Sequence, residues 1–171
     1  KAIITWFANE TIQECREACG GKGYLLENRI ADLKAEVDIF TTFEGDNTVL
    51  LQLAAKGILS DFNTEFNSAG FSAVFKLLGT QISDKLVTIN PIYANKVDKE
   101  HLYNPKFHQH AFDYRTRRLT YSAAMRIRDY IKKGIPTYQA FLKVQTHLIA
   151  LGKAYSCELA YNTYLQFTET I

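Results

Sequence analysis

The sequence predicts an all-α protein, a bundle of antiparallel helices followed by a second helical region. Apolar residues recur at steps of three and four along most of the chain, which is the period of an amphipathic helix. Only three prolines interrupt the 171 residues, so long helices have room to form. The chain is 47% apolar and 22% charged, a balance typical of a globular domain with a sizeable core.

Charge and hydropathy exclude two classes of partner. The formal net charge is +2 without a dense basic run, so a nucleic-acid partner has no electrostatic support. No apolar run approaches the roughly 20 residues that cross a bilayer. We therefore expect no nucleic-acid partner and no membrane span.

The cysteines and histidines do not predict a metal site. Cys15, Cys19 and Cys157 form an odd set without a signal peptide, which favours free thiols in a reducing compartment. Cys15 and Cys19 lie one helical turn apart, but no second Cys or His pair stands at ligand spacing, so we expect buried apolar thiols. His108 and His110 would point about 200° apart on a helix and could not share a metal.

The first third of the chain reads as three helices separated by irregular segments. The first carries an apolar stripe of Ile4, Ala8, Ile12, Cys15 and Cys19. Gly20 and Gly21 can take positive φ at its end, and on spacing alone they could be no more than a helix cap. A short helix with one face of Ile30, Leu33 and Val37 follows, with a cap available at Glu27–Asn28.

An acidic turn precedes the third helix. Residues 39–43 mix β-branched and aromatic side chains, which favours an extended or irregular backbone. Gly45 fits a turn, and Asp46 or Asn47 can cap a helix from about Thr48 to Leu59. We expect its inward face to hold Val49, Leu50, Leu53, Ala54 and Gly57. On composition alone, Glu44 reads most simply as an exposed capping carboxylate.

The polar run from Ser60 to Gly70 predicts a boundary, with one domain over residues 1–62 and another over 63–171. Helices are expected over residues 71–78 and from residue 82, and turns at Asn90-Pro91 and Asn104-Pro105. Two long helices close the chain and should form an antiparallel hairpin, because only a short connection around Gly134 separates them. Their apolar stripes are Phe112, Leu119, Ala123, Ile127 and Tyr130, then Phe141, Val144, Leu148, Leu151, Tyr155 and Leu159.

The two ends suggest that the chain is a piece of a longer one. Lys1 leads straight into a helical pattern without an initiator Met, and Ile171 follows an unfinished pattern. Function is therefore expected to belong to the longer protein.

Residues 14–53 resemble the flavin-dependent acyl-CoA oxidase and dehydrogenase superfamily. Two motifs carry the resemblance, CREACGGKGY and, at the superfamily's separation, FEGDNTVLLQ; the wording FEGDNTV is similar to the oxidase branch. The later YNPKFHQHAFDYRTRRL and the closing hairpin look like the second helical domain of the oxidases. The resemblance covers most of the chain, and its specific motifs lie in the first third.

The resemblance implies a C-terminal helical fragment of an enzyme of fatty-acid β-oxidation. Glu44 stands at the family's catalytic-base position: it takes the α-proton of fatty acyl-CoA while the β-hydride goes to FAD, giving trans-2-enoyl-CoA. In the oxidases O2 then reoxidises the flavin and yields H2O2. A positioned carboxylate in a dry slot suits so weak a carbon acid. By itself the fragment should be colourless and inactive, because the family's N-terminal helices and β-domain make most of the flavin site.

The resemblance also implies the remaining site residues. Glu17, Gly20, Gly21 and Gly23 match the loop that meets the FAD of the partner subunit in a homodimer; dehydrogenases commonly carry Gln where Glu17 stands. Asp46, Asn47 and Thr48 match the segment beside the flavin and its phosphates, and Phe43 and Gly45 would line the acyl pocket.

Two other functions remain open at this stage. One is an acyl-CoA dehydrogenase that passes electrons to an electron-transfer flavoprotein, and the other is a non-catalytic helical dimerisation module. The general appearance favours a bacterial cytoplasmic enzyme, or a peroxisomal one if the source is eukaryotic. The acyl-chain length cannot be read from this sequence.

Overall fold

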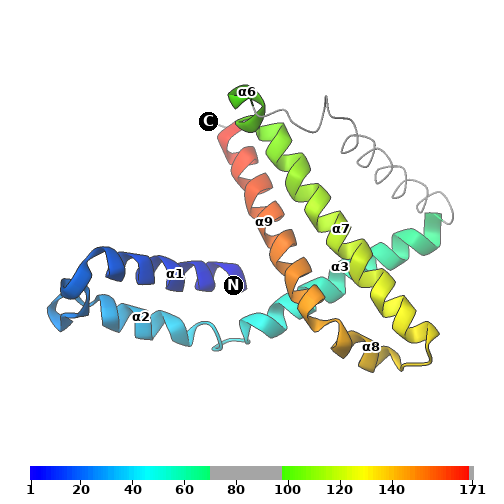
Figure 1. The fold of residues 1–171 in the computed structure, drawn as a ribbon, viewed down its shortest axis with the longest axis horizontal. Helices are drawn as coiled ribbons and strands as arrows, with labels where there is room; N and C mark the ends of the chain where they lie inside the picture. The colour runs from blue at the N-terminus through cyan, green and yellow to red at the C-terminus, as the bar shows by residue number, and fades with distance from the viewer. Residues whose placement is uncertain (70–97, 170–171) are drawn as a thin grey trace. The chain divides into compact units, whose positions relative to one another are not determined.

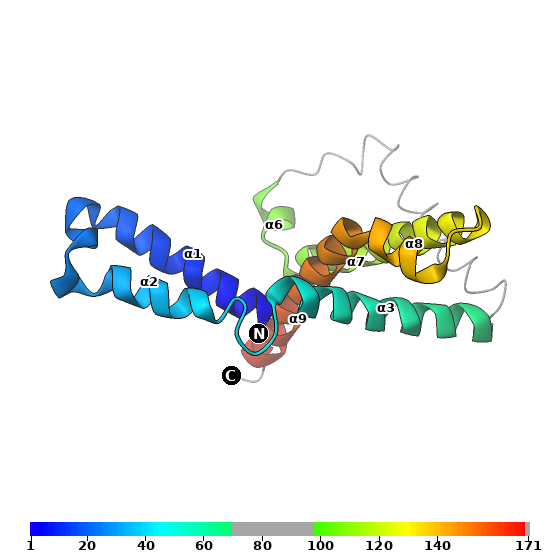
Figure 2. The same cartoon turned by 90° about the horizontal axis from the view of Figure 1, so that it is seen from below.

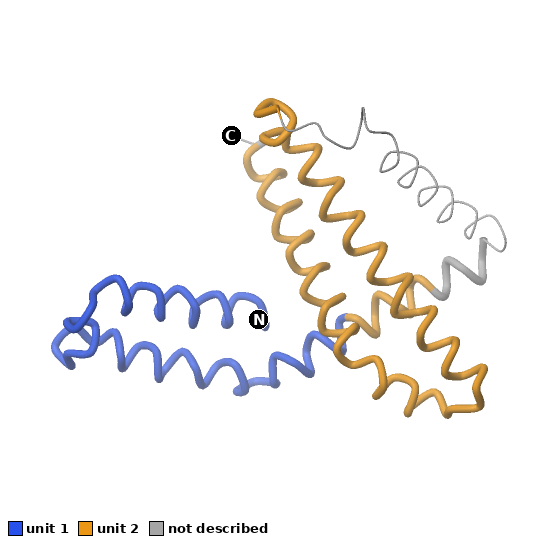
Figure 3. Tube along the Cα trace, in the orientation of Figure 1, with its two compact units in different colours: residues 1–54 blue, residues 55–171 orange. Residues whose placement is uncertain are grey.

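The computed structural model describes residues 1–69 and 98–169, and every regular element in these two ranges is a helix (Figure 1). The predicted all-α class is therefore confirmed. The chain forms two compact units, unit 1 over residues 1–54 and unit 2 over residues 55–171 (Figure 3). The helices expected over 71–78 and from 82, and the Asn90-Pro91 turn, lie outside the described residues.

Unit 1 is built on α1 (Ala2–Ala18) and α2 (Ile30–Ile39), which lie side by side in both views (Figures 1 and 2). Two 3-10 turns, η1 (Gly20–Tyr24) and η2 (Leu26–Asn28), join them. The chain reverses within these turns, so the two helices run antiparallel. The predicted first helix and the short second helix are both present.

Two glycines make this reversal possible. Gly20 has a φ of +57° just after α1, where a left-handed residue ends a helix at low cost. Gly23 is buried, and a Cβ added to it would come 2.4 Å from the carbonyl oxygen of Arg16. Only a glycine therefore lets η1 approach the α1 backbone so closely.

The start of α2 differs from the prediction. Its N-cap is Arg29, which has a left-handed φ of 55° and makes no side-chain cap hydrogen bond. Asn28 Nδ2 instead donates to the carbonyl oxygen of Lys22 at 2.8 Å. The predicted cap at Glu27–Asn28 is wrong, because η2 takes up these residues.

The predicted burial of two thiols is also wrong. Cys15 and Cys19 are both exposed and free. The main neighbours of α1 within unit 1 are α2 and η1, so much of the α1 surface has no covering element there. Ile4 and Phe7 on the same helix are 72% and 68% exposed.

The third helix, α3 (Asn47–Ala69), is longer than predicted and buries a different face. No proline or glycine stands between Ser60 and Ala69, and the helix continues through this polar run. Its buried hydrophobic residues are Leu51, Ala55 and Leu59, spaced by four, whereas Val49 and Leu53 are 60% and 63% exposed. The predicted inward face, which included Val49 and Leu53, is therefore wrong. The domain boundary after residue 62 stays a prediction.

Unit 2 contains α6 (Lys99–Leu102), α7 (Pro105–Lys132), α8 (Thr137–Lys143) and α9 (Gln145–Glu169). Helices α7 and α9 lie side by side (Figure 1). They run antiparallel, since Gln109 near the start of α7 donates to Asn162 near the end of α9 at 3.2 Å. This is the expected hairpin, except that its second arm breaks at Val144 into α8 and α9.

An apolar cluster holds unit 2 together. Its buried members are Ala55, Leu59, Ala123, Val144, Leu148 and Leu151. Side chains of the predicted stripes pack against it, among them Leu119, Ile127, Tyr130 and Phe141. The arginines of α7 are exposed, and Arg117 pairs with Asp113 at 2.7 Å.

Candidate functional site

Residues 40–46, here called the Glu44 turn, connect α2 to α3. Backbone hydrogen bonds close it: Phe43 N donates to Ile39 O at 2.8 Å and Asn47 N donates to Thr41 O at 2.9 Å. Glu44 and Gly45 are consecutive left-handed residues, with φ of 57° and 98°. A left-handed residue other than glycine costs about 1–2 kcal/mol. Such a conformation persists only where the surrounding structure holds it.

The first turn of α1 supplies that support. Asn47 is 1% exposed, and its Nδ2 donates to Ala2 O at 3.2 Å and to Thr5 Oγ1 at 2.8 Å. Lys1 Nζ donates to Asn47 Oδ1 at 2.9 Å and to Gly45 O at 2.6 Å. Every polar atom of the Asn47 side chain is thus used inside unit 1.

Asp46 caps α3. Its Oδ1 accepts from Thr48 N at 2.8 Å and from Val49 N at 3.2 Å, which confirms the predicted cap. Glu44 is exposed and is not the capping residue. The expected exposure of Glu44 is therefore confirmed, its expected role as a cap is wrong, and its carboxylate is available for another role.

The Glu44 turn also carries aromatic side chains that are exposed. Phe43 is 54% exposed and meets Phe40, itself 46% exposed, edge to face at 6.1 Å between ring centroids. A Cβ on Gly45 would come 3.3 Å from Leu50 Cδ2 at a φ that favours glycine. An exposed carboxylate on a turn with two exposed aromatic rings would lose most of its water if a further surface covered this turn.

In residues 20–23, here called the glycine loop, the structure of this chain explains two of the three glycines. Gly20 is required by its positive φ and Gly23 by its contact with Arg16. Gly21 has neither feature, since a Cβ there would meet nothing within 4 Å and its φ lies outside the left-handed region. The Gly21 backbone is therefore open to a molecule outside this chain.

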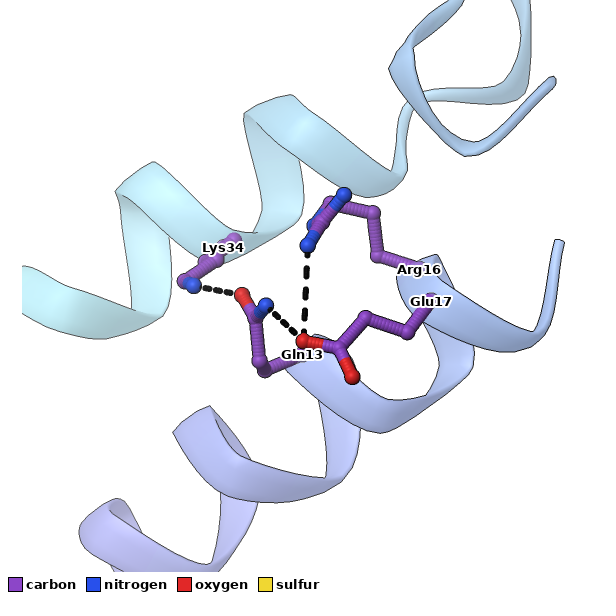
Figure 4. A network of polar contacts seen from close by, with 4 residues as sticks. All are labelled: Gln13, Arg16, Glu17 and Lys34. Carbon is purple, nitrogen blue, oxygen red and sulfur yellow. Dashed lines mark hydrogen bonds and ion pairs between the residues drawn. The ribbon is translucent and has the colours of Figure 1, made fainter. Parts of the chain in front are cut away.

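Glu17 belongs to a polar network at the α1–α2 contact (Figure 4). Gln13 Nε2 donates to Glu17 Oε1, and Arg16 Nη2 lies 3.6 Å from the same oxygen. Lys34 of α2 donates to Gln13 Oε1. The Arg16 guanidinium also lies 4.4 Å from the ring centroid of Tyr24.

Gln13, Arg16 and Lys34 were not among the predicted site residues. The spacing of Gln13 and Glu17 by four on a helix could have indicated their contact. No local pattern indicates Lys34, which is 21 residues away from Gln13.

The structure does not bring all predicted site residues together. The glycine loop follows the C-terminal end of α1, whereas Asn47 is bonded to Ala2 and Thr5 at the N-terminal end. A helix of 17 residues is about 25 Å long, so the loop and the Glu44 turn are separate sites on unit 1. Phe43, Gly45, Asp46 and Thr48 do cluster at the Glu44 turn.

Two searches of the described parts of the chain were negative. In residues 1–69 and 98–169, no helix is both long and apolar enough to cross a membrane. In the same ranges, no three His, Cys, Asp or Glu side chains are grouped so that they could hold a metal ion.

Comparisons with known proteins support one family. Residues 1–59 match the family model for the acyl-CoA oxidase C-alpha1 domain. The chain is 36% identical over 155 residues to the peroxisomal acyl-coenzyme A oxidase 2 of Arabidopsis thaliana, covering 91% of this chain and 22% of that protein. It is 48% identical over 59 residues to the human peroxisomal acyl-coenzyme A oxidase 3, covering 34% of this chain and 8% of that protein.

A solved structure agrees with the sequence comparisons. The crystal structure of acyl-CoA oxidase 3 from Yarrowia lipolytica matches with a TM-score of 0.71 and 25% identity, covering 92% of this chain and 22% of that one. The predicted resemblance to a C-terminal helical fragment of acyl-CoA oxidase is confirmed. The chain spans about a fifth of the length of the Arabidopsis and Yarrowia relatives.

Proposed function

From this similarity to the acyl-CoA oxidases, we propose that the chain is the base-bearing C-terminal part of an FAD-dependent acyl-CoA oxidase. The full-length enzyme converts fatty acyl-CoA to trans-2-enoyl-CoA and reduces O2 to H2O2. The observation that carries the proposal is Glu44 itself. It is an exposed carboxylate at the motif's base position, on a left-handed residue, not used for capping, and on a turn that also carries the exposed Phe40 and Phe43.

Glu44 acts as the general base. The α-proton of a thioester is a weak acid, so its removal needs a carboxylate held in place and shielded from water. The Glu44 turn supplies the fixed position, and Phe40 and Phe43 supply an apolar wall. The rest of the slot comes from the remainder of the full-length protein. FAD, when bound, accepts the β-hydride.

The chain's own residues fit FAD unequally. The open backbone at Gly21 fits a close approach by the FAD of a partner subunit, with Gly20 next to it and Glu17 on the last turn of α1. Gly23 supports this loop from inside. At the Glu44 turn, the Asp46 carboxylate caps α3 and would repel a phosphate. All polar atoms of the Asn47 side chain are already hydrogen-bonded within the chain. Thr48 and the backbone of Asn47 remain for a contact with the flavin's own subunit.

The test of this proposal is Glu44→Gln in the full-length enzyme. The variant should keep its flavin spectrum, because the amide preserves the shape of the side chain. Acyl-CoA oxidation should fall by more than the roughly 10²–10⁴-fold usual for a general base, because no other acceptor replaces Glu44. Glu10→Gln, on an exposed glutamate of α1, is the matched control and should turn over normally. Near wild-type turnover of Glu44→Gln would end the assignment.

Peroxide formation distinguishes the oxidase from the alternatives. Adding acyl-CoA to the full-length enzyme in air, with O2 as the sole electron acceptor, should release H2O2, whereas a dehydrogenase would need an electron-transfer flavoprotein. A non-catalytic dimerisation module would show no turnover at all. The 171-residue chain alone should be colourless and inactive, and a stoichiometric yellow fragment would contradict this.

We infer the compartment from the names of the relatives. The Arabidopsis and human relatives are named as peroxisomal, and we extend that compartment to the full-length protein. The bacterial cytoplasm favoured by the sequence alone has no support among these two relatives. Fractionation of the source cells against a peroxisomal marker would decide between the two compartments.

A further inference from the structure

We propose that Asn47, together with Lys1, is a positioning residue that holds the Glu44 turn in its left-handed conformation. The inference rests on the proposed function, in which Glu44 is the base. It assigns Asn47 a different role from flavin contact, because its side chain faces α1 and not an open surface.

Asn47 is a buried crosslink between two segments that are distant in sequence. Its amide nitrogen donates to Ala2 O and Thr5 Oγ1, 45 and 42 residues away, and its oxygen accepts from Lys1 Nζ. The side chain is 1% exposed. A buried polar side chain that is fully satisfied keeps one geometry, since any shift would leave a polar atom unpaired.

This crosslink reaches Glu44 over a very short path. Between Asn47 and Glu44 lie only Gly45 and Asp46, and Lys1 Nζ bridges the Gly45 carbonyl to the Asn47 oxygen. The backbone of Asn47 also bonds across the turn, from its N to Thr41 O at 2.9 Å. The position of the α1 end is thus transmitted directly to Gly45, the residue that follows the base.

Loss of the crosslink should let the turn relax toward an ordinary backbone conformation. Glu44 pays a steric cost in its left-handed conformation, so it has a lower-energy state to move to. A displacement of about 1 Å in a reacting group can cost about 10²-fold in rate. The consequence is a loss in kcat and not in substrate affinity.

The test uses Asn47→Ala in the full-length enzyme, with Asn9→Ala as the matched control. Asn9 is also a partly buried amide of unit 1; its Nδ2 donates to Thr5 O at 3.3 Å and to Val37 O at 3.4 Å, and neither hydrogen bond reaches the Glu44 turn. Asn47→Ala should lower kcat about 10- to 100-fold with KM changed less than about twofold. The isotope effect with α-deuterated acyl-CoA should rise, because proton removal becomes more rate-limiting. Asn9→Ala should keep kcat and the isotope effect.

Lys1→Met is a second variant that keeps the inference testable if Asn47→Ala does not fold. Lys1 is exposed, so its loss should leave folding intact, yet it removes the bonds to Gly45 and Asn47. We expect a drop in kcat of about tenfold. An unchanged kcat in folded Asn47→Ala or Lys1→Met, or an equal loss in Asn9→Ala, would overturn the inference while an inactive Glu44→Gln keeps the proposed function. An active Glu44→Gln would instead remove the proposed function.

Discussion

Each of the two units is stabilised internally by a different kind of interaction. In unit 2, large side chains such as Val144, Leu148 and Leu151 are at most 1% exposed and form one apolar cluster. In the described part of unit 1, the buried hydrophobic residues are Ala2 and Leu51 alone. Large apolar side chains there stay exposed, among them Ile4, Phe7, Leu26, Phe43 and Leu53.

The difference separates a scaffold from a site. An apolar core is non-directional and fixes helices by volume, as in unit 2. Unit 1 fixes one strained turn by directional hydrogen bonds through Asn47 and by a glycine contact at Gly23. The proposed base Glu44 needs a defined direction, and a water-poor slot forms around it only if another surface covers the turn. Under the proposed function, unit 1 carries part of a site, whereas unit 2 is a packed scaffold.

The largest expected effect is on the core of unit 2. Leu148→Ala removes a side chain that is 1% exposed and leaves a cavity in the cluster, which should cost about 2–5 kcal/mol of unfolding free energy. Leu159→Ala on the same helix, at a site that is 54% exposed, should cost less than about 1 kcal/mol. Urea unfolding of the 171-residue chain, followed by circular dichroism, measures both. Equal costs would mean that unit 2 is not held by this cluster.

The second effect sharpens the contrast within unit 1. Gly23→Ala places a methyl group 2.4 Å from the carbonyl oxygen of Arg16, so η1 must move away from α1. We expect a loss of about 1–3 kcal/mol in unfolding free energy, as for other overpacked sites. Gly21→Ala, with open space around the added methyl group, should change stability by less than about 0.5 kcal/mol.

Gly21→Ala should nevertheless weaken FAD retention by the full-length enzyme if the loop meets the cofactor of a partner subunit. Gel filtration followed by the ratio of flavin to protein absorbance measures this retention. The roles assigned to the two glycines would be wrong if the Gly21→Ala enzyme kept all its flavin and the Gly23→Ala enzyme were as stable as the wild type.

Helix α7 was predictable from sequence and the buried face of α3 was not. In α7 the apolar residues stand among many charged ones, so only one face can be buried. In α3 the run VLLQLAAKGIL is apolar on nearly every side, and its period cannot select the face on which Leu51, Ala55 and Leu59 lie. The burial of Cys15 and Cys19 was wrongly predicted because no element of unit 1 covers that part of the apolar stripe of α1.

At the site, local features were predictable and long-range ones were not. The turn at Gly45 and the cap at Asp46 follow from residue types next to a helix start. The bond of Lys1 to Asn47 joins residues 46 positions apart, which no local pattern encodes. The left-handed conformation of Arg29 was equally unpredictable from the sequence, because this conformation is uncommon for a residue other than glycine.

A third prediction compares helix caps in the two units. Asp46→Ala removes the cap of α3. Asn104→Ala removes the cap of α7, where Asn104 Oδ1 accepts from Lys106 N at 2.9 Å. Each should cost about 0.5–2 kcal/mol of unfolding free energy. Only Asp46→Ala should also lower kcat of the full-length enzyme, because Asp46 is part of the Glu44 turn. Equal kcat values for the two variants would weaken the division into site and support.

The smallest effect concerns an exposed cation in unit 2. Arg117 pairs with Asp113 one turn earlier at 2.7 Å, and the two side chains are 56% and 36% exposed. Such a pair should contribute about 0.3–0.5 kcal/mol, and high salt should reduce this further. A double-mutant cycle with Arg117→Ala and Asp113→Ala, measured by urea unfolding at low and high salt, gives the coupling free energy of the pair.

The exposed Lys1 of unit 1 should differ from Arg117: its substitution should have little effect on stability but should clearly lower kcat. The core already fixes α7 whether or not Arg117 is paired, whereas no comparable core lies behind the Gly45 carbonyl that Lys1 binds. A coupling above about 1 kcal/mol that resists salt would show that unit 2 also depends on directional polar contacts.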